Sequence, residues 1–254
     1  MFVSPSHKLI VFGDFSDVRV DTSEQKNNYI NLSNEFIKEN LLTGVKQDII
    51  FEFDPRKNEP PVQKMIMRPN IVSSDNKWIV NFSANRIDII LNSKKEDGFV
   101  DEEDFIKKAN KYLNIIKNSY SLKLNRIAVN IEDVLTDFSE EEANKILKKV
   151  MNTNISLYKD KSLKEWSLQC GVVETFSNEE KSVNIITSIQ RGSRNFFWNP
   201  NKYVDSITVL YDINTVVLKD NSEVLSDNVI ESFVKSYKDK ILFIKNDIFG
   251  EQNE

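Results

Sequence analysis

Four residues around position 50 have the types and spacing most suggestive of catalytic chemistry. Asp48 is followed by Glu52 and Asp54, and Lys57 lies three residues beyond Asp54. In metal-dependent nucleases, acids at a strand end hold a divalent ion and a nearby lysine assists the attacking water. That pattern has the lysine two residues after the second acid, and here Pro55 also intervenes. A metal-dependent nuclease or phosphoesterase using Glu52, Asp54 and Lys57 is therefore kept as an alternative, and the main interpretation assigns no catalytic residue.

Other residue types that support catalysis are scarce or poorly arranged. A second acidic cluster, Glu132, Asp133 and Asp137, has no regular ligand spacing and precedes a predicted helix, where acids complement the helix dipole. The six glycines are isolated, so neither GxxxxGK[ST] nor GxGxxG occurs. The sequence thus predicts no cofactor and no metal site.

The chain has one histidine and one cysteine. His7 lies in a polar segment near the N-terminus, so we expect it at the surface and expect no histidine-based catalysis. Cys170 lies in an apolar run and is expected to be a small core residue. A single cysteine cannot form an intramolecular disulfide. These two residues favour a protein without a catalytic centre.

Arginines and aromatic residues gather in the segment 190–203. Arg, Trp and Tyr are enriched at the hot spots of protein interfaces, which predicts a loop that binds a protein partner. Two alternatives remain open: the aromatic residues fill the core beneath the loop, or they stack on single-stranded nucleic acid. The interaction candidates are Arg191, Arg194, Phe196, Phe197, Trp198 and Tyr203.

Composition is typical of a folded, acidic protein. The chain has 254 residues, 40% of them hydrophobic, and a formal charge of −5, which does not favour binding through phosphate neutralisation. We find no signal-peptide pattern and no apolar stretch of membrane-spanning length. The expected location is cytoplasmic, without membrane contact.

The clearest predicted elements are a hairpin, a helix and a strand in succession. The hairpin comprises Trp78–Phe82 and Arg86–Leu91, because apolar residues alternate on both sides of a short turn. The helix begins at Asp101, and the strand is Leu124–Asn130. A looser version recurs near the end, where a strand over 206–218 precedes the final helix.

The remaining predicted elements follow from periodicity and capping signals. Two more helices are predicted, one over Asn31–Leu42 with Gly44 as its stop, and one starting at a capping box, Ser139 to Glu142. The final helix is expected to be capped near Ser226. The other predicted strands are Lys8–Phe12, Asp17–Val20, Asp48–Phe53, Gln63–Met67, 165–176 and 183–190.

Hairpins alternate with helices, and glycine-marked βαβ repeats are absent. This favours an α+β fold with mainly antiparallel sheets and helices packed on one face. The polar stretch after residue 151 is the best candidate for a boundary. We therefore expect two related, closely packed α+β halves, residues 1–152 and 153–254, with a single domain as the alternative.

Several short motifs resemble a sporadically distributed, uncharacterised prokaryotic family of roughly this length. They are the hairpin from Trp78 to Arg86, Glu103-Asp-Phe105, Asn125–Asn130, Asp137-Phe-Ser139 and Leu210–Thr215. The N-terminal stretch differs from the proline-bearing first strand that is usual in the family. The resemblance implies no activity and no catalytic residues, and the patchy distribution of the family implies mobile or defence-related genes.

The resulting hypothesis is a non-enzymatic protein-interaction subunit of a prokaryotic complex, connected with phage defence or toxin control. An exposed sheet edge, a helix face or the segment 191–203 would bind a still unidentified protein. Single-stranded nucleic acid is an alternative ligand that the charge does not favour, and self-association into a homo-oligomer is open.

Overall fold

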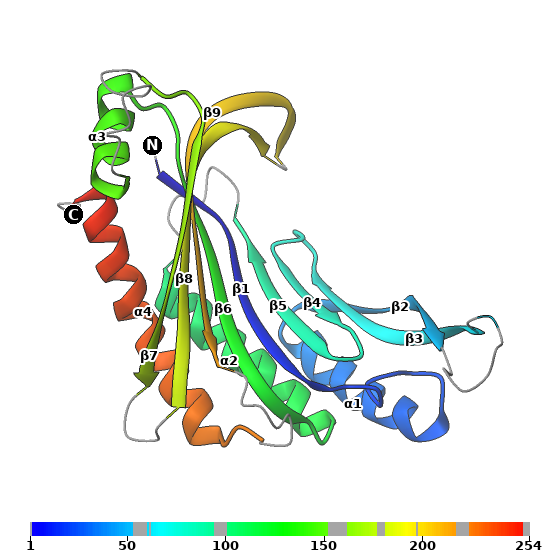
Figure 1. The fold of residues 1–254 in the computed structure, drawn as a ribbon. Helices are drawn as coiled ribbons and strands as arrows, with labels where there is room; N and C mark the ends of the chain where they lie inside the picture. Colours follow the sequence, from blue (N-terminus) through cyan, green and yellow to red (C-terminus); the bar gives the residue numbers. More distant parts are fainter. Residues whose placement is uncertain are drawn as a thin grey trace.

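The computed structural model describes residues 2–52, 60, 62–93, 101–151, 162–176, 181–196, 198–216 and 224–250. Within this part of the chain, nine antiparallel strands form one sheet with the order β2-β3-β4-β5-β1-β6-β9-β8-β7, accompanied by four helices (Figure 1). The predicted α+β class with mainly antiparallel sheet is confirmed.

The strands are long, and most connect to their sheet neighbours by hairpins. They are β1 (Phe2–Asp14), β2 (Leu41–Glu52), β3 (Val62–Ser73), β4 (Trp78–Phe82), β5 (Arg86–Asn92), β6 (Lys123–Leu135), β7 (Trp166–Phe176), β8 (Lys181–Phe196) and β9 (Asn199–Thr215). The helices are α1 (Ser23–Lys38), α2 (Glu102–Ser119), α3 (Glu140–Val150) and α4 (Asp227–Phe249).

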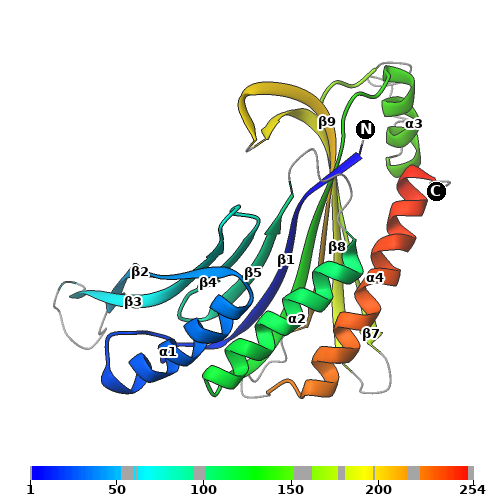
Figure 2. The same ribbon diagram turned by 180° about the vertical axis from the view of Figure 1, so that it is seen from behind.

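The main core lies between the sheet and its helices. Figure 2 shows α1, α2 and α4 in front of one face of the sheet, and Figure 1 shows the opposite, open face. Because side chains alternate along a strand, Leu9 and Val11 of β1 point to the helix face. They join one cluster with buried helix residues such as Phe36, Phe105 and Phe233. Apolar residues that alternate along the strands thus pack against the apolar sides of the helices and form one hydrophobic core on this face of the sheet.

The order of elements repeats within the sheet. A first strand, a helix, a meander of strands and a second helix occur as β1–α1–β2–β3–β4–β5–α2 and again as β6–α3–β7–β8–β9–α4. In both units the last meander strand pairs with the first strand, as β5 with β1 and β9 with β6. The antiparallel pair β1–β6 joins the units at the centre of the sheet. The predicted division at residues 152 and 153 stays a prediction.

Locally encoded elements agree with the sequence. The predicted hairpin is β4–β5, and the predicted capping box is formed, because Ser139 and Glu142 exchange hydrogen bonds at the start of α3. Asp101 caps α2 and Ser226 caps α4. These predictions are confirmed, and each depends on interactions within a few residues.

Two predictions around α1 are wrong. The helix is capped by Thr22 and ends at Lys38, because Asn40 adopts a left-handed φ of 61° and Leu41 already begins β2. Gly44 is therefore a strand residue and not a helix stop. The segment Asp17–Val20 is a connection and not a strand, although Val18 and Val20 are buried and Asp17 is exposed, as the alternation predicts.

Candidate functional site

The segment predicted to be an interaction loop is a β-hairpin. The ladder between β8 and β9 continues through Arg194, opposite Val204, to Phe196, opposite Asn199. Figure 1 shows the ends of β8 and β9 curling over together beyond the rest of the sheet. The loop prediction is wrong because backbone pairing extends past the apolar part of both strands. We call residues 191–205 the β8–β9 tip.

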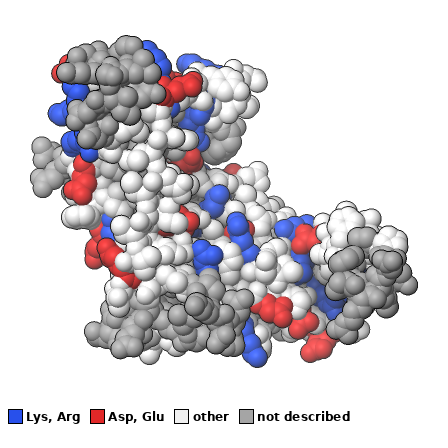
Figure 3. Space-filling model, viewed as in Figure 1, with Lys and Arg blue, Asp and Glu red and all other residues white. Residues whose placement is uncertain are grey.

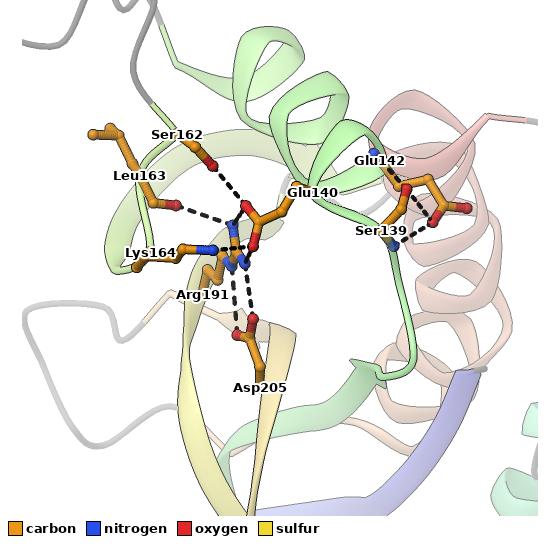
Figure 4. A network of polar contacts seen from close by, with 8 residues as sticks. All are labelled: Ser139, Glu140, Glu142, Ser162, Leu163, Lys164, Arg191 and Asp205. Carbon is orange, nitrogen blue, oxygen red and sulfur yellow. Dashed lines mark hydrogen bonds and ion pairs between the residues drawn. The ribbon is translucent and has the colours of Figure 1, made fainter.

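Arg191 fastens this hairpin to the start of α3 (Figure 4). Its side chain is 1% exposed and donates hydrogen bonds to Glu140 at 2.8 and 3.1 Å and to Asp205 at 2.8 Å. It also donates to the backbone carbonyl of Leu163 at 3.0 Å. Arg191, followed by Lys164, holds the pKa of the Glu140 carboxyl well below its usual range. Arg191 is thus an internal clamp and not an exposed contact residue.

Replacing Arg191 with alanine is expected to lower the free energy of unfolding by about 2 kcal/mol, because two carboxylates lose a buried partner. Urea unfolding monitored by circular dichroism measures this loss. The matched control is Lys164→Ala, which removes an exposed cation from the same Glu140 carboxylate and should cost less than about 0.5 kcal/mol. Equal losses in both variants would contradict the assignment of Arg191 as the clamp.

The aromatic residues of the tip pack on the open face of the sheet. Phe196 and Trp198 stack with their ring centroids 4.5 Å apart. They form a small hydrophobic cluster with Val3 and Val134, separate from the main core. Phe196 is buried, as in the core-filling alternative, whereas Phe197 lies outside the described residues.

The other two interaction candidates occupy different environments. Arg194 donates to Glu132 at 2.6 Å and to Thr208 at 3.2 Å, and its guanidinium lies 5.0 Å from the Phe196 ring centroid. Tyr203 is 70% exposed. Alternation along β9 puts Tyr203 on the opposite face from Val204, which packs against the aromatic cluster. The structure therefore brings Arg194, Phe196 and Trp198 together and separates Tyr203 from them.

A cavity of about 160 Å³ opens beside the stacked rings. Phe196, Trp198 and Val204 provide apolar walls, while Asp137 and Lys202 place one negative and one positive charge at its border. Asp137 has a left-handed φ of 56°, at the turn between β6 and α3. The cavity is also lined by Val3, Thr136 and Asn199. We call it the tip cavity.

The nuclease pattern lies only partly within the described residues. Asp54 and Lys57 are outside them, and Glu52 is the last residue of β2. The first acid of the pattern, Asp48, has its carboxylate 3.0 Å from Nε of Arg68, whose side chain is 1% exposed. Asp48 is therefore engaged in an ion pair, and the alternative interpretation with Glu52, Asp54 and Lys57 stays a prediction. Among the described residues, no three His, Cys, Asp or Glu side chains are grouped as metal ligands.

Sequence reasoning placed Asp133 in an acidic cluster ahead of a predicted helix, but the residue lies in β6 and belongs to a buried polar cluster between the sheet and the helices. Lys245 of α4 places its amine 2.9 Å from Asp133 of β6 and 2.6 Å from Glu102 of α2. Ser4 donates a hydrogen bond of 2.6 Å to Asp133. Burial lowers the pKa of Lys245, but the charges of Asp133 and Glu102 outweigh it and leave this pKa raised. The cluster therefore holds a charged lysine inside the molecule and ties both units to the central strands.

His7 belongs to the same region, and its predicted surface position is wrong. The side chain is 0% exposed, and its ring centroid lies 5.2 Å from that of Phe105. Burial, and secondarily the charge of Lys245, lowers the pKa of His7 to about 3. His7 lies on the helix face of β1 together with Leu9 and Val11. The three residues are spaced two apart, and this alternation in the sequence indicates that His7 is buried. His7 is neutral at neutral pH and enclosed.

The prediction for Cys170 is also wrong. The residue is exposed on β7, an outermost strand of the sheet. An edge strand lacks a neighbour on one side, so part of its apolar run stays in contact with solvent.

No protein-family model and no curated protein matches this chain. No helix among the described residues is long and apolar enough to cross a membrane. Lysines, arginines and acidic residues are interspersed over the open face in Figure 3, without one large basic area. The fold and the site define an α+β protein with a curved antiparallel sheet and a small, partly open recess beside an outlying hairpin.

Proposed function

We propose that this protein is a non-enzymatic interaction subunit that binds a protein partner through the tip cavity. The observation that carries the proposal is the arrangement of stacked Phe196 and Trp198 beside an apolar recess with charged borders. Binding energy at protein interfaces is concentrated where one anchor side chain fills such a recess. The expected ligand is therefore a protein segment that presents an apolar side chain.

The size of the recess suits one side chain. A cavity of about 150 Å³ accommodates a benzene-sized group, and the tip cavity has about 160 Å³. Asp137 and Lys202 at the border favour a partner that carries a basic and an acidic group beside its apolar anchor. A leucine, methionine or phenylalanine flanked by opposite charges fits this description.

The surroundings of the recess support a preorganised site. Arg191 clamps the hairpin to α3. Hydrogen bonds to Glu132 and Thr208 hold Arg194 with its guanidinium over the Phe196 ring. Side chains that are already ordered lose little conformational entropy on binding. The interspersed charge of the open face supports protein over single-stranded nucleic acid, which binds along a continuous basic groove.

The wider role follows from the resemblance to a patchily distributed prokaryotic family. We place the subunit in a prokaryotic complex connected with phage defence or toxin control. The tip cavity would carry the recognition in that complex, and a separate partner would supply any enzymatic activity.

The variants Lys202→Glu and Trp198→Ala are both expected to weaken partner binding at least tenfold. The first reverses a border charge on an exposed residue, and the second removes one wall of the tip cavity. Tagged wild type and variants are used to recover the partner from the native host after nuclease treatment, and affinity is then measured by calorimetry with the purified partner.

Tyr203→Ala is the matched control, because Tyr203 is exposed and lies on the other face of β9. Thermal unfolding verifies that each variant is folded. Undiminished binding by folded Lys202→Glu and Trp198→Ala, or loss of binding only in Tyr203→Ala, would remove the basis for the tip cavity as the binding site.

A further inference from the structure

Among the described residues, β2 is a long strand with a neighbour on one side. It ends the sheet there and pairs with β3, in a continuous register from Leu41, opposite Ser73, to Glu52, opposite Val62. Edge strands are usually shielded from pairing by prolines, bulges, short length or several charges. β2 contains no proline and its ladder shows no register shift. It does carry three charged residues, Lys46, Asp48 and Glu52. Within the described part of the chain no second strand lies along its outward backbone groups, so these can pair with a strand of another chain.

One face of the β2–β3 hairpin is apolar and exposed. Val45, Ile49 and Phe51 of β2 are 42%, 55% and 68% exposed. On β3, Met65 and Met67 are 60% and 37% exposed, and Met65 lies directly opposite Ile49. All five residues have odd numbers in an unshifted ladder, so their side chains share one face. We call this set the arm patch.

The opposite edge of the sheet, β7, does not gather its exposed apolar side chains on one face. On β7, Val172 and Val173 are the large hydrophobic residues more than half exposed. They are adjacent in sequence, so they point to opposite faces of the strand. Among the β7 residues whose exposure the structure describes, there is therefore no one-sided apolar stripe, and β2 is the edge suited to association.

We propose that a second copy of this chain pairs with β2, antiparallel to it, about a two-fold axis at Gln47. Isologous contacts with two-fold symmetry are the commonest way in which soluble proteins form oligomers. The two sheets would join into one, and the two arm patches would form a continuous surface. This inference uses a different surface from the tip cavity and is independent of the proposed function.

The register follows from the position of the apolar side chains. Directly opposed residues of an antiparallel pair lie on the same face. When the axis passes through a residue, odd-numbered positions of one copy lie opposite odd-numbered positions of the other. With the axis at Gln47, Val45 lies opposite Ile49 of the second copy, and Thr43 lies opposite Phe51. An axis between two residues would instead place the arm patches on opposite faces. Burial of both patches therefore requires an axis through a residue.

Charge then selects Gln47 over its neighbour. Axes through Lys46 and Gln47 give the longest overlap of the two strands. An axis at Lys46 places the Lys46 side chains of the two copies opposite each other, and these like charges repel. An axis at Gln47 places Lys46 of each copy opposite Asp48 of the other. Within one chain Lys46 lies 3.9 Å from Asp48, which also pairs with Arg68, and the Lys46 and Asp48 side chains are 34% and 26% exposed. The second copy would therefore add a contact between chains to an existing pair. Figure 1 shows β2 and β3 projecting sideways at one end of the sheet.

The register predicts which cysteines form disulfides between copies. In a Cys170→Ser background, Gln47→Cys should cross-link to itself under mild oxidation, because its own position lies opposite. Val45→Cys and Ile49→Cys should each stay uncross-linked alone and cross-link when mixed. Failure of Gln47→Cys, or cross-linking of Val45→Cys alone as efficient as in the mixture, would overturn the proposed register.

Sedimentation equilibrium of the wild-type chain tests the dimer itself. Lys46→Asp places acids opposite Asp48 twice and should raise the dimer dissociation constant at least tenfold. Lys64→Asp, on the exposed part of β3, is the matched control and should leave that constant unchanged. A monomeric wild type at all soluble concentrations, or equal weakening by both substitutions, would overturn the proposal.

Discussion

Replacing Lys245 with alanine is expected to lower the free energy of unfolding by about 3–5 kcal/mol. The substitution leaves the carboxylates of Asp133 and Glu102 without the amine that lies 2.9 and 2.6 Å from them. Asp133 is almost fully buried, so water cannot replace the lost charge. Urea unfolding at pH 7, followed by circular dichroism, measures the difference.

Lys240→Ala is the matched control for this prediction. Lys240 lies on the same helix and pairs with Glu174, whose side chain is 48% exposed. Ion pairs at the surface contribute less than about 1 kcal/mol. Similar losses for Lys240→Ala and Lys245→Ala, or a loss below about 1 kcal/mol for Lys245→Ala, would show that the buried cluster does not hold the two units together.

The stability of the wild-type protein is expected to fall by about 3 kcal/mol between pH 7 and pH 4 through His7 alone. Its pKa is lowered from 6.5 to about 3 by burial. The unfolded chain therefore binds a proton as the pH drops below 6.5, while the folded chain does not. The stabilising contribution is complete above pH 6.5 and is lost as the pH falls towards 3.

His7→Leu isolates this contribution, because His7 is the only histidine of the chain. Leucine fills a similar buried space and does not titrate, and Asp and Glu titrate equally in both proteins. The free energy of unfolding is measured in urea at intervals from pH 7 to pH 4. The difference between wild type and variant should change by about 1.4 kcal/mol per pH unit below 6.5. Parallel curves would exclude a buried, neutral His7.

These two effects describe groups that stabilise the fold. His7 carries no proton at neutral pH and is enclosed, and Lys245 is held between two carboxylates. Neither is placed to act on a substrate. Histidine and lysine often serve catalysis in other proteins. In this protein, His7 and Lys245 connect the helices to the central strands.

Elements encoded by neighbouring residues could be predicted from the sequence. The β4–β5 hairpin follows from alternation around a short turn, and the start of α3 follows from the reciprocal bonds of Ser139 and Glu142. The start of α1 was missed although Thr22 is a suitable cap, because the apolar stripe becomes regular only at Leu32.

Features that depend on distant residues could not be predicted in this way. The pairing of β1 with β6 joins segments far apart in the sequence, and nothing local indicates it. The β8–β9 tip resembles a loop because Arg191 is polar, and its burial depends on Glu140 from another element. Lys245 lies on the apolar side of α4, four residues after Ile241 and three before Ile248, a spacing that could have indicated burial.

The candidate site was only partly accessible to sequence reasoning. The concentration of arginine and aromatic residues drew attention to the segment 191–203, and its role in binding stays a prediction. Their separate roles depend on tertiary contacts: Arg191 is a clamp, Phe196 and Trp198 wall a cavity, and Tyr203 faces away. Asp137, which lines the cavity, comes from a turn that is remote in sequence. The sequence marked it as part of an acidic cluster, but nothing local linked it to the segment 191–203.

The most direct test of the proposed function is site-specific photo-cross-linking from the tip cavity in the native host. A photoreactive phenylalanine at Asn199, which lines the cavity, should cross-link to one protein, within one segment that contains an apolar residue flanked by charges. The same probe at Tyr203, on the other face of β9, should give no such product. Cross-links from Tyr203 to the same segment, or no protein cross-linked from Asn199, would contradict the assignment of the tip cavity as the partner-binding site.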